Sequence, residues 1–374
     1  MIARAAPRIF VSAGEPSGDL HGAGVVRALR RRHPEALIEA LGGARMEAAG
    51  ATLRYRMDGL AAFGLVEVVT KLGAHWRLLQ ALRRDFAAHR YDLVILIDYP
   101  GFHLRVAEAA RGAGTKVLWY IAPQLWAWRP ERARRLAAAV DRLAVVLPFE
   151  QPFFGGLGVR SDYVGHPLVD RGPPPGRADV RRRLGIPLEA RVLGIFPGSR
   201  RQEVRRLWGP FRDAAVRLLR EQRCQHVLVA GTAELDYPEP GPLQVLRGEP
   251  GAVLAASDAV LAKSGTTTLE AALADIPMVV AYKVHPVTYR MFQRLRTVRW
   301  VSLVNLVANR EVVPELLQER AAADALADAL APLLDRADPR TVAQLEGLAL
   351  VRGRLGAPGA TDRVVGLADE LLAG

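Results

Sequence analysis

The stretch that decides the fold is Leu261-Ala-Lys-Ser-Gly-Thr-Thr-Thr-Leu-Glu-Ala-Ala272. It joins the end of a predicted buried strand, Asp258–Ala262, to a predicted helix, Thr266–Leu273. A junction of this kind presents backbone N–H groups, hydroxyls and the positive end of a helix to an anion. Serine and threonine also favour ordinary helix starts, so this stretch alone indicates either an anion site or a plain helix cap.

A second junction of the same type lies earlier in the same half of the chain. The predicted strand Arg191–Phe196 is followed by Pro197-Gly-Ser-Arg-Arg-Gln-Glu203 and by a helix that runs to about Arg220. Two such junctions in one half favour a phosphate-type anion site over two independent helix caps. The other elements predicted in this half are strands at His226–Ala230 and Met278–Tyr282 and a nearly continuous helical region from Pro314 onwards.

The N-terminal half begins with a comparable strand, loop and helix. A mostly apolar run, Arg8–Ala13, precedes the glycine-rich segment Gly14–Gly24 and an amphipathic helix at Val25–Arg32. The glycine spacing differs from that of the dinucleotide-binding fingerprint, so a nicotinamide or flavin site is not indicated. The glycines permit close approach of a ligand to the backbone, and Glu15 and Asp19 bring carboxylates to the same rim.

Asp98 follows the most apolar strand of this half. The strand Tyr91–Ile97 ends directly before Asp98, which in turn precedes a Pro-Gly turn. Ligands of open α/β sheets bind off the carboxyl ends of the strands, so Asp98 is a candidate catalytic residue. A turn or helix-cap aspartate is the other interpretation of this position. The remaining predicted strands are Leu37–Leu41, Lys116–Ile121, Arg142–Leu147 and Asp162–Val164.

The alternation of strands and helices stops at a proline-rich linker, residues 171–178, and then restarts. We therefore expect an α/β protein of two doubly wound, Rossmann-like domains that face each other across a ligand-binding cleft. The N-terminal domain is predicted to span residues 1–170 and the C-terminal domain residues 179–345. The placement of the last helices, in residues 346–374, is left open, and one expected arrangement is that they cross back to the N-terminal domain.

Length and composition limit the classes of function. With 374 residues, half of them hydrophobic, the chain is long enough for two globular domains. The single cysteine, Cys224, precludes an internal disulfide, and the scattered histidines predict no metal cluster. We expect neither a signal peptide nor a membrane-spanning segment. The net charge of +12 comes mostly from arginine, and without aromatic residues between the arginines it favours solvated helix faces or an anionic membrane surface over nucleic acid.

A dense apolar segment, residues 60–79, has two interpretations. A buried helix is one of them. The other is an apolar patch that contacts membrane lipid, flanked by basic residues such as Lys71 and Arg77. The predicted membrane contacts are Val66, Val68, Val69 and Leu72.

Seven collinear motifs between residues 8 and 320 give the chain a resemblance to a known family. They are Ala13-Gly-Glu-Pro-Ser-Gly-Asp19, Ile97-Asp-Tyr-Pro-Gly-Phe102, Gln124-Leu-Trp-Ala-Trp128, Val164-Gly-His-Pro167, Pro197-Gly-Ser-Arg200, Ser264-Gly-Thr-Thr-Thr-Leu-Glu270 and Arg310-Glu-Val-Val-Pro-Glu-Leu-Leu-Gln318. Together they resemble lipid-A-disaccharide synthase, an inverting, metal-independent glycosyltransferase family with the two-domain GT-B fold. The resemblance implies transfer of 2,3-diacylglucosamine from UDP to 2,3-diacylglucosamine 1-phosphate (lipid X), which yields UDP and a β-1,6-linked lipid A disaccharide phosphate.

The resemblance also implies partners and a location. We expect a UDP-sugar donor, the lipid X acceptor, no cofactor, no metal and no nucleic acid. We expect the protein to be cytoplasmic and peripherally associated with the inner face of the bacterial inner membrane. Whether it forms a homodimer is left open.

Roles follow for the residues of the motifs. Glycosyl transfer needs a base for the acceptor hydroxyl and positive charge for the departing diphosphate. Asp98 is the expected base and Arg200 the expected diphosphate clamp, and no Asp-x-Asp pair occurs in the chain. The predicted donor site comprises Gly198, Ser199, Arg200, Lys263, Ser264, Gly265, Thr266, Thr267, Glu270, Asn305, Glu315 and Gln318. For Lys263, a role in the donor site and a place as a solvated strand-end residue are weighted equally. Gly14, Glu15, Ser17 and Asp19 are assigned to the acceptor or sugar.

Some positions depart from the pattern of the family. Pro16, His21, Thr267, Val304 and the pair Gln124-Leu125 differ from the residues expected there, although none removes a proposed catalytic group. They fit a family member with another acyl-chain preference or a paralogue with another lipid acceptor. A UDP-N-acetylglucosamine 2-epimerase and a non-catalytic nucleotide-sugar binder are the rival hypotheses. The apolar segment 60–79 and the Asp98 motif argue against the epimerase.

Overall fold

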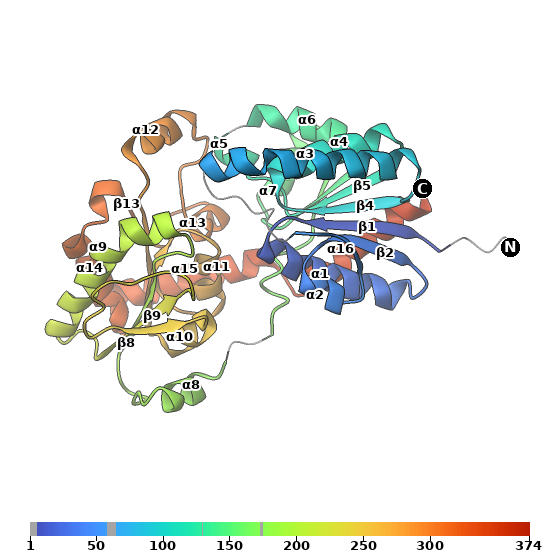
Figure 1. Ribbon diagram of the computed structural model, residues 1–374. Helices are drawn as coiled ribbons and strands as arrows, with labels where there is room; N and C mark the ends of the chain where they lie inside the picture. The colour runs from blue at the N-terminus through green and yellow to red at the C-terminus, as the bar shows by residue number, and fades with distance from the viewer. Residues whose placement is uncertain (1–5, 58–64, 129, 173–174) are drawn as a thin grey trace. The chain divides into compact units, whose positions relative to one another are not determined.

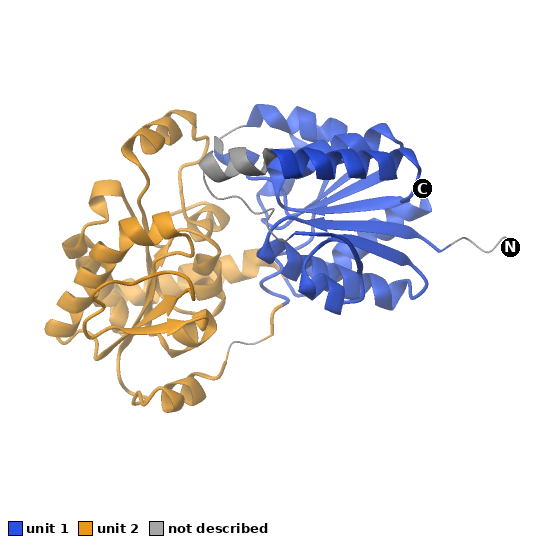
Figure 2. Ribbon diagram, in the orientation of Figure 1, with its two compact units in different colours: residues 1–170, 357–374 blue, residues 171–356 orange. Residues whose placement is uncertain are grey.

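The computed structural model describes residues 6–57, 65–128, 130–172 and 175–374, with the backbone alone for residues 65–72 and Trp128. The described chain divides into two compact units, shown in Figure 2. Unit 1 combines residues 1–170 with the C-terminal segment 357–374, and unit 2 comprises residues 171–356. The second unit thus extends beyond the boundary expected at residue 345, because helix α15 (Pro339–Leu355) packs within it.

Unit 1 contains a parallel sheet of seven described strands in the order β3-β2-β1-β4-β5-β6-β7. The strands are β1 (Arg8–Ala13), β2 (Leu37–Gly42), β3 (Thr52–Arg56), β4 (Leu93–Ile97), β5 (Lys116–Tyr120), β6 (Arg142–Val145) and β7 (Ser161–Tyr163). The helices are α1 (Pro16–Arg32), α2 (Ala44–Ala48), α3 (Leu65–Ala87), α4 (Pro100–Gly112), α5 (Leu125–Trp128), the 3-10 turn Pro130–Arg132, α6 (Ala133–Ala139), α7 (Glu150–Gly155) and α16 (Ala360–Ala373).

Helices cover both faces of this sheet, with α3, α4 and α6 on one side and α1, α2 and α16 on the other (Figure 1). Strands covered on both faces need apolar side chains in both directions. This explains why β4, Leu-Val-Ile-Leu-Ile, is completely buried. Burial of this kind holds the carboxyl ends of the central strands in fixed positions.

Unit 2 contains a parallel sheet of six described strands in the order β10-β9-β8-β11-β12-β13. The strands are β8 (Val192–Phe196), β9 (His226–Gly231), β10 (Gln244–Arg247), β11 (Ala259–Lys263), β12 (Met278–Tyr282) and β13 (Glu315–Leu317). The helices are α8 (Arg177–Arg183), α9 (Arg201–Arg220), α10 (Pro250–Ala256), α11 (Thr266–Leu273), α12 (Pro286–Leu295), α13 (Leu303–Ala308), α14 (Ala323–Leu330) and α15, with 3-10 turns at Gln318–Arg320 and Ala331–Leu334.

One apolar layer of unit 2 lies between its sheet and the helices α9 and α14. Leu207, Phe211 and Leu218 of α9 face alternate side chains of β8 and β11 in one buried cluster. Their spacings of four and seven residues form the apolar stripe of an amphipathic helix. The stripe sets the direction of α9, and therefore the place where its N-terminus meets the carboxyl end of β8.

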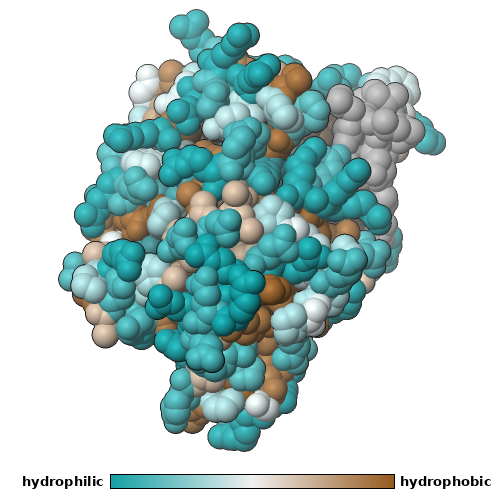
Figure 3. Space-filling model, turned by 90° about the vertical axis from the view of Figure 1, so that its left-hand side faces the viewer, coloured by the Kyte–Doolittle hydropathy of each residue, from teal (hydrophilic) through white to brown (hydrophobic). Residues whose placement is uncertain are grey.

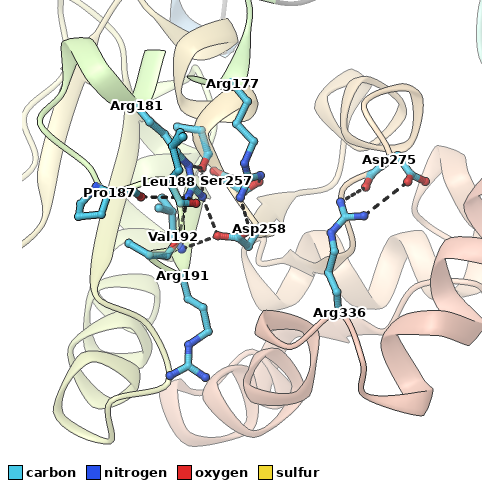
Figure 4. Close-up of polar contacts among 12 residues, drawn as sticks. Arg177, Arg181, Pro187, Leu188, Arg191, Val192, Ser257, Asp258, Asp275 and Arg336 are labelled. Carbon is cyan, nitrogen blue, oxygen red and sulfur yellow. Dashed lines mark hydrogen bonds and ion pairs between the residues drawn. The ribbon is translucent and has the colours of Figure 1, made fainter. Parts of the chain in front are cut away.

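The arginines at residues 181–183 were expected to lie on a solvated helix face. Arg182 and Arg183 are exposed, but Arg181 is not. Arg181 is completely buried, and its guanidinium donates to the backbone carbonyls of Ala256, Leu188 and Ala190 and to Asp258 (Figure 4). A buried charge is stable only when its hydrogen bonds are satisfied. Arg181 meets this condition and fastens α8, which follows the linker, to the amino-terminal edge of the second sheet.

The predicted glycine-rich loop at residues 14–24 is wrong, because α1 already begins at Pro16. Proline at the first helical position has a suitable φ and needs no hydrogen-bond donor. Two of the three glycines inside the helix permit close packing. A Cβ on Gly18 would lie 3.0 Å from the Cβ of Ala13, and one on Gly22 would lie 2.3 Å from the sulfur of Met46.

Three short strands were not predicted: β3, β10 and β13. β3 and β10 lie at sheet edges and are only partly buried, so they lack the continuous apolar pattern of central strands. β13 has three residues and interrupts the region after Pro314 that was predicted to be helical. Its pairing with β12 completes the edge of the second sheet, a contact that no local pattern encodes.

The C-terminal segment belongs to unit 1. α16 contacts α1 and β5, and both carboxylate oxygens of Asp170 accept hydrogen bonds from the first backbone N–H groups of this segment, at Gly359, Ala360 and Thr361. His33 and Asp369 pair at 2.6 Å near its end. A helix cap and side-chain contacts therefore fix α16 on unit 1, where the chain returns after unit 2.

The apolar segment 60–79 is described only in part. Helix α3 includes its second portion, and Leu79, Leu82 and Phe86 are buried against unit 1. Trp76 is 63% exposed. Residues 58–64 and the side chains of Val66, Val68, Val69 and Leu72 lie outside the described residues. The C-terminal half of α3 is thus a packed helix, and the predicted lipid contact stays a prediction.

Candidate functional site

Four of the seven motifs lie where the strand order of each sheet reverses. In unit 1 the reversal is between β1 and β4, whose last residues Ala13 and Ile97 are paired. In unit 2 it is between β8 and β11, where Phe196 pairs with Ala262. Crossover helices leave these points in opposite directions, which opens a crevice for ligands at the carboxyl ends of the strands. Each unit therefore carries its candidate residues at the usual ligand position of its fold.

Asp98 and Tyr99 have an unusual backbone in unit 1. Their φ angles are +49° and +54°, in the left-handed region that residues other than glycine rarely adopt. The ring of Tyr99 fills the space beside Gly14, where a Cβ would lie 2.3 Å from a ring carbon. The Tyr99 hydroxyl also contacts Nε2 of His75 on α3 at 2.7 Å. Gly14 is therefore needed to seat Tyr99, and this packing holds the strained turn in place.

The carboxyl group of Asp98 is poised to exchange a proton near neutral pH. Burial, together with the negative charge of Glu15, raises its pKa to about 6, and the backbone N–H of Tyr99 partly opposes this rise. A general base works best when its pKa lies near the working pH. Asp98 therefore has both the position and the protonation behaviour of a base.

His103, on α4, was missed by the sequence analysis. It is completely buried, and its Nδ1 lies 2.7 Å from the carbonyl oxygen of Asp98 while Nε2 lies 2.8 Å from Oγ of Ser12. A carbonyl can only accept, so Nδ1 carries the proton and Nε2 accepts from the Ser12 hydroxyl. Burial lowers the pKa of His103 to about 4, so the ring is neutral at pH 7. This neutral link ties β1 to the turn that bears Asp98.

The other residues assigned to this rim are not equivalent. Glu15 is partly exposed and Ser17 exposed, and both remain accessible at the start of α1. Asp19 is 3% exposed, and its carboxylate accepts hydrogen bonds from the backbone N–H groups of Gly43, Arg45 and Met46. Asp19 therefore caps α2 within the unit instead of lying free at the rim. The helical start of α1 turns it inward, which a loop would not have done.

The N-terminus of α9 forms the first part of the site in unit 2. Gly198 has φ of +113°, and a Cβ there would lie 2.5 Å from a carboxylate oxygen of Glu203. That carboxylate accepts from the backbone N–H groups of Ser199 and Arg200 at 3.3 Å each. Its other oxygen lies 3.0 Å from Nζ of Lys263. Glu203, which the sequence analysis did not select, thus joins the two anion-type junctions.

The N-terminus of α11 forms the second part. Ser264 is nearly buried, and its hydroxyl donates to the carbonyl of Val301 at 2.9 Å. Gly265 precedes the helix, and Thr268 donates to the Gly265 carbonyl at 2.8 Å. Thr266 is exposed at the first helical position. The backbone around Thr266 and Thr267 is thus presented by a rigid turn, while the hydroxyl of Ser264 is used within the fold.

Glu270 lies one turn into α11 and is partly exposed. Its Oε1 accepts from Nη1 of Arg171 at 2.7 Å. Arg171 is the first residue of unit 2, at the predicted linker. A ribose hydroxyl that binds Glu270 would therefore compete with a partner that is nearly half exposed and easily displaced.

Three further donor-site candidates have side chains that are committed to loops. The amide of Asn305, fully buried, donates to Glu315 and to the carbonyl of Val313, while the carboxylate of Glu315 accepts from the N–H groups of Val301 and Ser302. Gln318 makes two hydrogen bonds to the backbone of Val284. Asn305 and Glu315 hold the segment to which Ser264 is attached. They therefore support the N-terminal turn of α11 through Ser264 and Val301.

Among the described residues, no cluster of three or more His, Cys, Asp or Glu side chains could hold a metal ion. In the same part of the chain, no helix combines the length and the apolar character needed to cross a bilayer. Arg200 and Lys263 are among the positive groups near the two helix N-termini. The site can thus neutralise a diphosphate with side chains and backbone N–H groups.

The chain matches a family model described as "Lipid-A-disaccharide synthetase" over residues 9–348. It is 40% identical to a lipid-A-disaccharide synthase from Geobacter sulfurreducens over 375 residues, which covers 98% of this chain and 97% of that protein. It is 43% identical to a lipid-A-disaccharide synthase from Pseudomonas aeruginosa over 338 residues, with 88% and 89% covered.

Solved structures with the same fold are more distant in sequence. UDP-GlcNAc 2-epimerase from Neisseria meningitidis, bound to UDP-GlcNAc, has a TM-score of 0.67 and 12% identity, and covers 97% of this chain and 100% of its own. The glycotransferase of kitacinnamycin has a TM-score of 0.66 and 18% identity, with 98% and 100% covered. These likenesses show the GT-B fold of paired parallel α/β domains.

Proposed function

This chain belongs to the lipid-A-disaccharide synthase family of glycosyltransferases, and on that premise we propose its substrates and its mechanism. The donor is UDP-2,3-diacylglucosamine and the acceptor is 2,3-diacylglucosamine 1-phosphate. The acceptor hydroxyl attacks the anomeric carbon as the bond to the diphosphate breaks. UDP leaves, and the configuration inverts to give the β-1,6-linked disaccharide phosphate.

Asp98 is the base in this proposal, and its place directly after β4, where the strand order of the first sheet reverses, is the observation that carries it. A carboxyl group at the reversal point of the first sheet has a pKa of about 6, so at pH 7 it is mostly ionised yet is a stronger base than an ordinary aspartate. It takes the proton of the acceptor hydroxyl as the new glycosidic bond forms. His103 acts as a positioning residue, since it contacts the backbone of Asp98 and not its carboxylate.

The departing diphosphate is stabilised by the second unit. Backbone N–H groups at the start of α9 and α11 and the side chains of Arg200 and Lys263 supply positive charge without a metal ion. Lys263 forms an ion pair with Glu203, and the arriving diphosphate would share its ammonium group. Glu270 binds the ribose hydroxyls, for which its carboxylate leaves Arg171.

Peripheral association with a membrane is part of the proposal because both substrates carry acyl chains. The apolar side of α3 is the expected contact, and Trp76, in the described part of α3, is 63% exposed. An apolar patch of this kind suits an enzyme that takes its acceptor from a bilayer.

The test is to incubate the purified chain with both substrates and to analyse the lipids by mass spectrometry. We expect the disaccharide phosphate and one UDP for each disaccharide, both undiminished by excess EDTA. UDP release without the lipid acceptor, or epimerisation of UDP-N-acetylglucosamine, would contradict the proposal. Loss of turnover in EDTA that is restored by a divalent cation would contradict its metal-free form.

A further inference from the structure

Helix α12 of unit 2 has no buried residue, although it is strongly amphipathic. Val287, Met291 and Leu295 are 66%, 54% and 43% exposed. Their spacing of four residues places them on one stripe of the helix. Single exposed apolar residues are normal on protein surfaces, but three on one stripe of a ten-residue helix indicate a contact surface.

Basic residues border this stripe. Arg290 and Arg294 each lie three residues after an apolar member of it, and both are exposed. From residue 283 to residue 310 the sequence contains six basic residues and no acidic one. In the part of the chain that the structure describes, neither Arg290 nor Arg294 forms an ion pair. The segment that carries the stripe is therefore strongly positive.

The inner side of α12 is formed by other residues. Tyr289 and Phe292 are partly buried. Tyr289 lies on the side of the helix opposite the stripe, and Phe292 lies beside the stripe. The helix start is fixed as well, because Nδ1 of His285 accepts from the N–H of Val287. Two hydrogen bonds between the side chain of Gln318 and the backbone of Val284 hold the segment that joins β12 to α12. The apolar stripe is consequently presented outward by a helix whose start is anchored.

We propose that α12 lies on an anionic bilayer surface, with the stripe Val287, Met291 and Leu295 among the lipid chains and Arg290 and Arg294 at the phosphate headgroups. Amphipathic helices with basic polar flanks bind membranes in this way, and arginine can bury its methylene groups while its charge stays in the headgroup layer. The face of the molecule in Figure 3 shows apolar side chains intermixed with hydrophilic ones.

The charge decides between candidate occupants. A second copy of this chain would bring six more basic residues of the same segment, which disfavours a symmetric contact through α12. A nucleic acid would satisfy the arginines but leave the apolar stripe without a partner. Of these three occupants, an anionic lipid surface alone matches both parts of the helix. The inference rests on the proposed membrane association of the enzyme and assigns it a contact in unit 2, separate from α3.

The test compares binding of the full chain to vesicles of phosphatidylcholine alone and to vesicles with about one third phosphatidylglycerol, by flotation. The first variant combines Val287→Ser, Met291→Ser and Leu295→Ser. We expect it to weaken binding to the anionic vesicles at least roughly tenfold. Its matched control replaces three other exposed apolar residues of unit 2, Leu188→Ser, Val342→Ser and Leu350→Ser, and should bind as the parent does.

The second variant, Arg290→Gln with Arg294→Gln, isolates the charge. It should weaken binding to anionic vesicles by about fivefold for each arginine and leave binding to neutral vesicles unchanged. The control Arg182→Gln with Arg223→Gln removes two exposed arginines elsewhere in unit 2 and is expected to lose much less. Added salt should erase the difference between parent and arginine variant.

Several outcomes would overturn the proposal. Parent-like binding of the serine variant would show that α12 is not the contact. Lower thermal stability of that variant would mean that the stripe packs on protein, and a change from dimer to monomer would mean that a second copy covers it. Tight binding of a polynucleotide that depends on the two arginines but not on the stripe would point to nucleic acid. Transfer measured with detergent-dispersed substrates tests the proposed reaction separately, because it needs no bilayer.

Discussion

The rate of transfer should depend on pH through Asp98. Its pKa of about 6 lies well above the ordinary value of 3.8. At about pH 7 roughly nine tenths of the groups are ionised and at about pH 5 roughly one tenth, so kcat/KM should fall about tenfold between them. An aspartate with the ordinary pKa would stay mostly ionised at both values, and the rate would be nearly flat.

The variant Glu15→Gln makes this prediction specific. Removal of the Glu15 charge, the second cause of the raised pKa, should move the midpoint of the kcat/KM profile toward acid pH by up to roughly one unit. The midpoint should stay above the ordinary value because burial, the larger cause, remains. Since the acceptor phosphate also titrates near pH 6, the informative quantity is the difference between variant and parent.

The assay is the initial rate of UDP release at several pH values, with parent and variants measured on the same substrates. Glu35→Gln removes an exposed acid of unit 1 that lies outside the candidate site and serves as the control, with an expected midpoint equal to that of the parent. A flat profile in the folded parent, or equal midpoints for parent and Glu15→Gln, would refute the role of Asp98 as a buried base.

The remaining predictions concern stability and donor binding. Asp98→Asn should abolish transfer yet raise the free energy of unfolding at about pH 8 by up to roughly 3 kcal/mol. The reason is the raised pKa, because the ionised carboxylate destabilises the fold above about pH 6 and not below about pH 4. Urea unfolding of parent and variant at about pH 8 and about pH 4 checks this, and equal free energies of unfolding for the two proteins at about pH 8 would contradict it. Arg200→Ala should weaken UDP binding by about 1.5–3 kcal/mol in calorimetry, whereas Arg220→Ala, at the other end of α9, should not. Asp19→Ala should lower the free energy of unfolding by about 1–3 kcal/mol through loss of the α2 cap; normal stability with a raised acceptor KM would return Asp19 to the acceptor site.

Much of the fold follows from local sequence patterns. The strands Arg8–Ala13 and Met278–Tyr282 and the helix Thr266–Leu273 have the predicted bounds, because buried parallel strands and a helix after a Ser-Gly-Thr turn leave clear signals. The edge strands β10 and β13 left none. Their pairing depends on neighbours far away in the sequence, which no local window contains.

The residues of the candidate site also divide into those that a local sequence pattern reveals and those that only a contact with a distant segment reveals. Asp98 and the Gly198–Arg200 turn were found because each follows an apolar strand at its carboxyl end. Glu203 and His103 were missed, since each lies inside a helix and matters through a contact with another segment. Asp19 was assigned to the rim because its neighbours read as a loop, whereas the structure has it in the first turn of α1. The sequence shows which residues follow a strand, but not which way a side chain points.

The most direct test of the account is a single reaction. The purified chain is incubated with UDP-2,3-diacylglucosamine and 2,3-diacylglucosamine 1-phosphate, and the lipids are analysed by mass spectrometry beside an Asp98→Asn control. We predict a β-1,6-linked disaccharide 1-phosphate and an equal amount of UDP from the parent, and neither product from the control. Unchanged substrates with the folded parent, or disaccharide formed at the parental rate by Asp98→Asn, would contradict the account.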